Sequence, residues 1–138
     1  MQFDFACHFL EDTTIRCRDF PAVLSWPAKG DTCEQWAEYV IFDWLHFLMR
    51  DDESIPVASP AEEGEYVVRL TITQTAKIVL HNARVEAKVS KAELAKRTGM
   101  SLTSVERMFN LRQPTKIESI REALRSLGKD FTLGAVDL

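Results

Sequence analysis

The side chains between residues 91 and 116 carry the chemistry that best fits a ligand, namely hydrogen bonding and ion pairing with DNA. Arg107 has a planar fork of N–H donors that matches the edge of guanine, so we expect it to contact a base. Lys91 is predicted to contact a phosphate from the start of a helix. Ser101, Thr103 and Ser104 are expected on the same exposed side as Arg107, and Asn110, Arg112 and Lys116 are expected to hold phosphates.

Two short helices must position these side chains. Ser90 followed by Glu93 forms a capping box that starts a helix near Lys91, and Gly99 is placed to take the positive φ angle at its end. Ser101 caps a second helix. On this second helix the apolar residues recur at three- and four-residue steps and are predicted to be buried: Leu102, Val105, Met108 and Phe109.

The spacing of Ala95, Gly99 and Val105 is typical of a helix-turn-helix, in which the two helices cross at the alanine and turn at the glycine. The second helix of such a unit lies in the major groove of DNA. An ordinary helical hairpin with a polar face has the same spacing, so the motif alone does not decide between the two.

The distribution of charge favours the DNA-binding interpretation. Residues 1–72 contain five Lys or Arg and fourteen Asp or Glu, a net charge of −9, whereas residues 73–138 contain twelve and seven, a net charge of +5. A basic half around a helix-turn-helix is expected for a nucleic-acid binder. The acidic half should avoid DNA and suits a basic partner, such as a protein that binds RNA.

Other chemistries have little support in the sequence. The three cysteines are an odd number without short pairing, which argues against a secreted disulfide framework and favours a reducing cytoplasm. No C-x-x-C or His pair has ligand spacing, and no nucleophile motif is present, so we predict no catalytic residue, cofactor or metal. No stretch reaches the ~20 apolar residues of a membrane span.

The first half is predicted to be a βββαβ layer. Alternating residues predict strands at 2–10, 13–18 and 22–26, and a strand at 66–72 follows an exposed loop at 51–65. Asp31 and Glu34 are expected to cap a helix over 32–50. Its apolar residues extend beyond one face, so we expect the extra surface to meet a second copy or a partner. The predicted buried stripe is Cys33, Ala37, Val40, Trp44 and Leu48.

The second half is predicted to contain four helices. The first runs over 74–87 and the helix pair follows it. Thr115 and Glu118 form a further capping box, which starts a last helix that Gly128 ends. Its predicted buried stripe is Ile117, Ile120, Leu124 and Leu127. The tail at 131–138 is expected to add a strand against its counterpart in another copy.

Several short stretches, in their order and spacing, carry a resemblance to a known family that spans nearly the whole chain. They are the aromatic first strand, Asp19-Phe20-Pro21, Gly30-Asp31-Thr32, Ile55-Pro56-Val57-Ala58-Ser59 and the unit from Lys91 to Asn110. The chain resembles the HicB antitoxins of bacterial toxin-antitoxin pairs, in the version with a C-terminal helix-turn-helix. It departs in a longer link at Trp26-Pro27-Ala28-Lys29 and in Ala58, where proline is frequent.

The resemblance implies an α+β fold, with a partial ribonuclease H-like layer at 1–72 and an all-α helix-turn-helix domain at 73–138. It implies a non-enzymatic inhibitor whose first domain binds a small basic HicA-type toxin that degrades mRNA and covers its active site. The second domain would bind the operator DNA of its own operon as a dimer and repress transcription.

Two alternatives stay open. A ribonuclease H-like layer can hold metal on carboxylates such as Asp4, Asp19 and Asp43, but two-metal chemistry needs several acids around ions about 4 Å apart, and solvated acids are the favoured interpretation. The first half could instead sense a small ligand in a stand-alone repressor. In each DNA-binding interpretation we expect a homodimer or higher homo-oligomer, since two copies read two half-sites.

Overall fold

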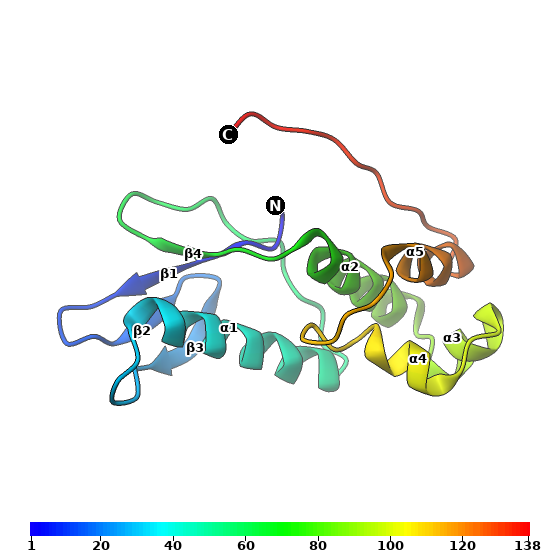
Figure 1. Cartoon of the computed structure of the whole chain (residues 1–138), viewed down its shortest axis with the longest axis horizontal. Coiled ribbons are helices and arrows are strands. Elements are labelled where there is room, and N and C mark those ends of the chain that lie inside the picture. Colours follow the sequence, from blue (N-terminus) through cyan, green and yellow to red (C-terminus); the bar gives the residue numbers. More distant parts are fainter. The chain divides into compact units, whose positions relative to one another are not determined.

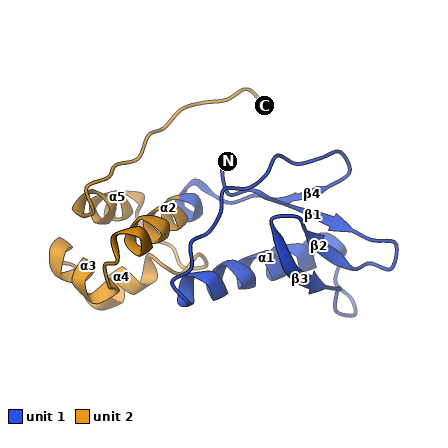
Figure 2. Cartoon of the chain, turned by 180° about the vertical axis from the view of Figure 1, so that it is seen from behind, with its two compact units in different colours: residues 1–75 blue, residues 76–138 orange.

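The computed structural model describes all residues from 1 to 138, and the chain divides into two compact units (Figure 2). Unit 1 is Met1–Thr75 and unit 2 is Ala76–Leu138. Unit 1 contains a four-stranded sheet and one long helix, and unit 2 is helical (Figure 1). The α+β class expected from the sequence is confirmed.

The sheet of unit 1 has the strand order β3-β2-β1-β4 and is antiparallel throughout. The strands are β1 (Phe5–Phe9), β2 (Ile15–Cys17), β3 (Phe20–Ser25) and β4 (Tyr66–Val68). Strands β1, β2 and β4 are shorter than predicted, whereas β3 begins two residues before its predicted start. The fourth strand ends at Val68 because the backbone N–H of Leu70 donates to the Asp4 carboxylate at 3.0 Å, which takes the chain out of the ladder.

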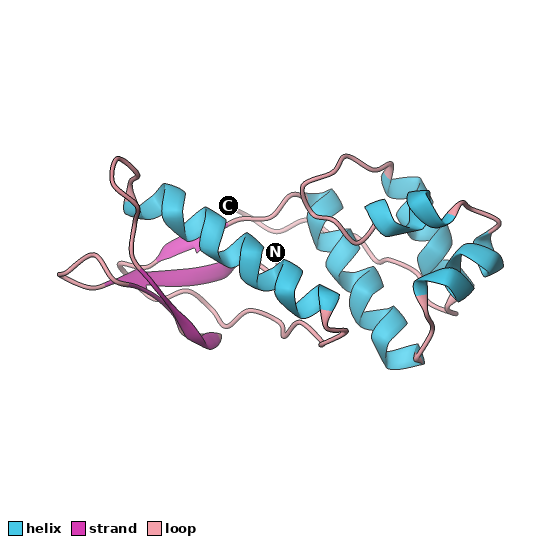
Figure 3. Cartoon of the chain, turned by 90° about the horizontal axis from the view of Figure 1, so that it is seen from below, coloured by secondary structure: helices cyan, strands magenta, loops and turns pink.

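The predicted alternation of buried and exposed side chains is present in β2 but only in part in β1, where Ala6 of the predicted polar face is 0% exposed. Cys7 pairs with Cys17 across the two strands and both are buried, whereas the neighbouring pair His8 and Arg16 is exposed. The period of two therefore gives the sheet one apolar face and one polar face. Helix α1 (Cys33–Arg50) lies along one face of the sheet (Figure 3), and the rings of Phe20 and Trp44 meet at 6.3 Å between their centroids.

The cap of α1 differs from the prediction. Thr32, not Asp31, is the N-cap, and its side chain accepts from the backbone N–H of Gln35 while the Gln35 side chain accepts from that of Thr32. The predicted residue pair was therefore displaced by one position. The Thr32 backbone is extended, as an N-cap requires.

The buried stripe of α1 also differs. Ala37 is buried as predicted, but it is joined by Ile41, Leu45 and Met49 rather than by the other predicted residues. The two stripes share an i, i+4 spacing and differ by a rotation of the helix. Periodicity could not choose between them, because α1 is apolar around most of its circumference.

Helix α2 (Ile72–Ala87) starts two residues before the predicted position. Thr71 caps it: its hydroxyl accepts from the backbone N–H of Gln74, and the Gln74 side chain accepts from that of Thr71. This capping box has the same chemistry as the one at Thr32.

Unit 2 continues with α3 (Lys91–Thr98), α4 (Leu102–Arg107) and α5 (Ile117–Ser126), and α3 contacts both α4 and α5. The Thr115 and Glu118 box is absent. Lys116 is the N-cap of α5 without a side-chain hydrogen bond, and Thr115 Oγ1 is buried with no partner. The tail after residue 128 has neither helix nor strand in the single chain, so its pairing with another copy stays a prediction.

Candidate functional site

Three residues set the ends of the helix pair α3 and α4. The Ser90 hydroxyl accepts from the backbone N–H of Glu93 and starts α3. Gly99 ends it with a φ angle of 72°, a conformation that costs glycine least. Ser101 then caps α4 by accepting from the backbone N–H of Ser104 at 3.1 Å. The helix pair expected from the sequence is therefore present.

Helix α4 has one buried side and one exposed side. Val105 is buried within it, and Met108 and Phe109 directly after it are buried too. Thr103, Ser104 and Arg107 are exposed, as predicted. Leu102 contradicts the prediction, because 46% of it is exposed. It lies only about 60° around the helix from Val105, but it is the first residue of α4, so no preceding turn of the helix covers its side chain.

The eight predicted DNA contacts fall into three groups. Ser101, Thr103, Ser104 and Arg107 come together on α4 or at its cap, and all four are exposed. Asn110, Arg112 and Lys116 follow in the connection to α5. The Asn110 side chain already accepts from the backbone N–H of Arg112 at 3.0 Å, so it holds the turn. Lys91 is the first residue of α3.

Lys91 has a structural contact that the sequence did not predict. Its ammonium lies 5.2 Å from the centroid of the Phe109 ring, and the guanidinium of Arg84 lies 5.1 Å from the same centroid. Cations at these distances are attracted to an aromatic ring. Lys91 therefore helps to fix the segment that follows α4.

A buried lysine that the sequence did not predict hydrogen-bonds to the end of α4 and to the turn after it. Lys77 is 0% exposed, and its ammonium donates to the backbone carbonyls of Arg107 at 3.0 Å, Asn110 at 2.8 Å and Gln113 at 2.6 Å. These carbonyls lie at the end of α4 and in the turn after it, where intrahelical partners run out. Burial lowers the pKa of Lys77 to about 8.

The exposed side of α1 has different chemistry. Three residues on the side opposite its buried stripe form the aromatic stripe, defined here as Trp36, Tyr39 and Phe47. Tyr39 is 57% exposed and Phe47 is 42% exposed. The rings of Trp36 and Tyr39 have centroids 6.0 Å apart. Large aromatic groups exposed in this way are typical of a surface that binds another protein.

Trp44 and Arg50 hold the aromatic stripe in place. The Trp44 and Phe47 rings stack with centroids 5.3 Å apart, and the Arg50 guanidinium lies 5.2 Å from the Phe47 centroid. At the other end of the helix, Trp36 Nε1 donates to Ser25 Oγ at 2.8 Å. These contacts fix the rings before any partner binds, so less side-chain entropy is lost on binding.

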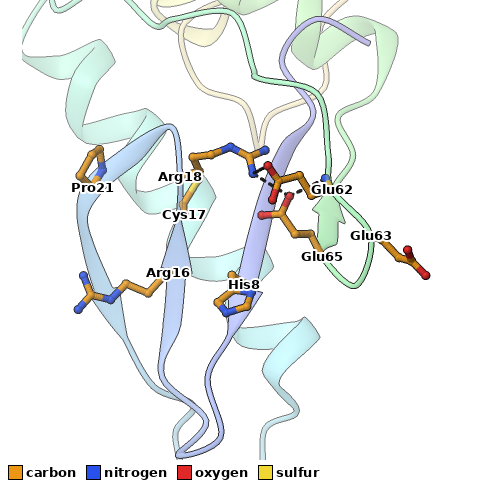
Figure 4. Close-up of a pocket in the computed structure, with 8 residues that line it drawn as sticks. All are labelled: His8, Arg16, Cys17, Arg18, Pro21, Glu62, Glu63 and Glu65. Atoms are coloured by element: carbon orange, nitrogen blue, oxygen red, sulfur yellow. Dashed lines mark hydrogen bonds and ion pairs between the residues drawn. The ribbon is translucent and has the colours of Figure 1, made fainter.

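A pocket on the polar face of the sheet has a volume of about 470 Å³. Figure 4 shows that Arg18 points toward Glu62 and Glu65, with its guanidinium 3.4 Å and 3.1 Å from their carboxylates. Its remaining lining residues are His8, Arg16, Cys17, Pro21 and Glu63. Small-molecule sites are mostly apolar, so this charged lining gives little support to the ligand-sensing alternative.

The carboxylates of the nuclease alternative are engaged elsewhere. Asp4 accepts from the backbone of Leu70, and Asp19 accepts from the backbone and hydroxyl of Ser59. Asp43 is exposed on α1. No group of three or more His, Cys, Asp or Glu is placed to hold a metal ion. Convergence of carboxylates, which two-metal chemistry requires, is not found.

The cysteines are free thiols. A hydrogen bond between the Cys7 and Cys17 side chains raises the pKa of Cys7 and lowers that of Cys17. Cys7 and Cys17 are both buried, and a buried free cysteine packs as a small apolar group. Separately, none of the helices has the length and apolar character needed to cross a membrane.

Comparison with known proteins gives the chain a family. A family described as HicB_like antitoxin of bacterial toxin-antitoxin system matches residues 10–79. Antitoxin HicB 2 of Photorhabdus laumondii is 32% identical over 93% of each chain, and Antitoxin HicB of Pseudomonas fluorescens is 31% identical over 96% of this chain and 94% of its own. Antitoxin HicB of Escherichia coli K12 is 28% identical over 83% of each chain. The chain therefore belongs to the HicB-like antitoxin family, whose members act in bacterial toxin-antitoxin systems.

Proposed function

We propose that the chain is an antitoxin with two separate binding surfaces. Unit 1 binds and inhibits a HicA-type toxin that degrades mRNA, and unit 2 binds the operator DNA of its own operon and represses transcription. The observation that carries this proposal is the opposite charge of the two units, −9 for residues 1–75 and +5 for residues 76–138.

The toxin-binding surface is centred on the aromatic stripe of α1. A toxin that acts on mRNA must attract phosphates and is therefore basic. The acidic unit 1 attracts such a partner over a distance, and the exposed rings of Tyr39 and Phe47 provide the apolar contact. Inhibition requires no catalytic residue in this chain, since covering the active site of the toxin is sufficient.

The DNA-binding surface is the exposed side of α4 with the residues that flank it. Arg107 contacts a base edge from α4, and Thr103 lies four residues before it on the same side of the helix. Ser101 and Ser104 contact DNA near the cap. Lys91, Asn110, Arg112 and Lys116 contact phosphates, which fix the position of the helix without reading sequence.

The toxin-binding domain comprises residues 1–72, and the domain for DNA binding and dimerisation comprises residues 73–138. A homodimer or larger homo-oligomer places two α4 helices on two half-sites, about one turn of DNA apart. We place this assembly in the cytoplasm, where mRNA and operon DNA are both found.

Co-expression with the product of the adjacent gene tests the proposal. We expect a basic neighbour of under a hundred residues to be toxic alone, harmless with this chain, and retained on it during purification. The purified chain should shift DNA from upstream of its operon in a gel at concentrations that leave random DNA unshifted. Selective shifting without a toxic neighbour would instead favour a stand-alone repressor.

A further inference from the structure

Leu102 differs from every other apolar residue of α4 and the segment that follows it. It is 46% exposed, whereas Val105, Met108, Phe109 and Leu111 are all buried. A single exposed leucine is ordinary on a protein surface. Leu102 is unusual in its position, because it is the first residue of the helix that carries Thr103 and Arg107.

At the start of α4, Leu102 and Thr103 are exposed and their side chains take no part in the cap. Ser101 accepts from the backbone N–H of Ser104, and the two hydroxyls also bond to each other at 2.9 Å. Both serine side chains are therefore committed to the cap and have less capacity left for a base edge. The adjoining leucine has no polar atom in its side chain that needs a partner.

We propose that Leu102 reads the methyl group of a thymine in the operator, so that α4 recognises sequence by an apolar contact as well as by Arg107. This inference rests on the proposed DNA-binding function of unit 2. In a helix-turn-helix, the first residues of the second helix contact base edges in the major groove. The thymine methyl is the apolar group that base edges present there.

The geometry of α4 places this thymine beside the base that Arg107 contacts. The two residues are five positions apart, which is about 7.5 Å along the helix axis and about 140° around it. Leu102 lies at one edge of the exposed arc of the helix, and Thr103 and Glu106 lie between it and Arg107 on that arc. Leu102 and Arg107 therefore reach different bases, and both are needed to define a half-site.

Deoxyuridine substitution tests the proposal, because uracil lacks only the methyl group of thymine. Each thymine of the upstream DNA is replaced in turn, in both half-sites together, and binding of the full-length chain is measured by fluorescence anisotropy. We expect one replacement to weaken wild-type binding about fourfold per half-site, the effect of removing one buried methyl group. The Leu102→Ala variant should bind unsubstituted DNA more weakly than the wild type does, and the deoxyuridine replacement should not weaken its binding further.

Ile117→Ala is the matched control, since Ile117 is 37% exposed but starts α5 rather than α4. It should keep the wild-type response to deoxyuridine. Thermal melting checks that both variants remain folded.

The outcomes separate this proposal from the proposed function. If the wild type binds upstream DNA selectively but no thymine methyl matters, or if Leu102→Ala keeps the same sensitivity, the role of Leu102 is refuted and operator binding stands. If the wild type does not discriminate upstream DNA from random DNA, operator recognition itself is refuted.

Discussion

The exposed sides of α1 and α4 belong to the same chain but have opposite chemistry. Helix α1 presents the rings of Trp36, Tyr39 and Phe47 in a unit of net charge −9. Helix α4 presents hydroxyls, a guanidinium, the carboxylate of Glu106 and one leucine in a unit of net charge +5. Aromatic side chains fixed by packing suit a protein surface, whereas short polar side chains and Arg suit base edges. The comparison supports a separate partner for each unit.

Substituting the aromatic stripe should have the largest effect and should separate the two surfaces. We expect Tyr39→Asp combined with Phe47→Asp to weaken toxin binding at least about 1,000-fold, because each aromatic anchor typically contributes about 2 kcal/mol or more. Calorimetry with the adjacent gene product measures this change. Operator binding should be unchanged.

Leu10→Asp is the control for the stripe, since Leu10 is also exposed in unit 1 but lies at the turn after β1. It should bind the toxin as the wild type does. Wild-type toxin affinity in the doubly substituted chain would show that the aromatic stripe is not the toxin-binding surface.

Lys77→Met should destabilise unit 2 while unit 1 keeps its own core. Three carbonyls lose the charged donor that joins them, so we expect the free energy of unfolding of unit 2 to fall by about 2–4 kcal/mol. Hydrogen exchange measured residue by residue locates the loss. An equal loss of protection from exchange in the amides of β1 and β2 would show that unit 1 is destabilised as well and would contradict this prediction.

The pH dependence of this loss has a definite sign. Burial lowers the pKa of Lys77 from 10.5 in the unfolded chain to about 8. Between these two pH values the unfolded chain binds more protons than the folded chain, so the free energy of unfolding of the wild type rises with pH, whereas Lys77→Met lacks this rise. The difference in free energy of unfolding between wild type and variant should be constant below pH 8. Above pH 8 it should grow by at most about 1.4 kcal/mol per pH unit. Urea titrations from pH 7 to 10 measure this difference, and a difference that does not change with pH would contradict the lowered pKa.

Arg107→Ala should reduce the preference for operator over random DNA about 10- to 100-fold, the usual value of one bidentate base contact. Arg107→Lys is the informative companion, because it keeps the charge and loses the planar fork. We expect it to bind all DNA with nearly wild-type affinity and to lose the preference. Competition gel shifts with random DNA measure both variants, and an unchanged preference would remove Arg107 from the base-reading surface.

The local elements were predictable from the sequence because their signals are local. Alternation identified β1 and β2, and the caps at Ser90 and Ser101 identified α3 and α4. The buried stripe of α1 was not predictable, since several apolar stripes run along that helix and tertiary packing selects one.

The exposure of the α4 side chains was predicted correctly for Thr103, Ser104 and Arg107 and wrongly for Leu102. Periodicity placed Leu102 with Val105, yet at the first position of a short helix no preceding turn covers the side chain. Lys77 was missed because a lysine is normally exposed. Its burial depends on carbonyls 30 to 36 residues away, a separation that no local pattern records.

The smallest expected effect distinguishes two lysines that both contact phosphate in the proposed complex. Lys116→Ala should weaken operator and random DNA alike and reduce the slope of log affinity against log salt by about 0.9, the value for one lost phosphate contact. Its stability should be unchanged, since Lys116 caps α5 without a side-chain bond. Lys91→Ala should reduce the slope by the same amount but also cost about 0.5–1 kcal/mol of stability, because its ammonium lies over the Phe109 ring. Salt-dependent anisotropy and thermal melting of both variants give the two quantities. Equal melting temperatures of the two variants would show that the contact with Phe109 adds no stability and that Lys91 acts only in DNA binding. If either variant lost operator binding but kept random-DNA binding, that lysine would contact a base rather than a phosphate.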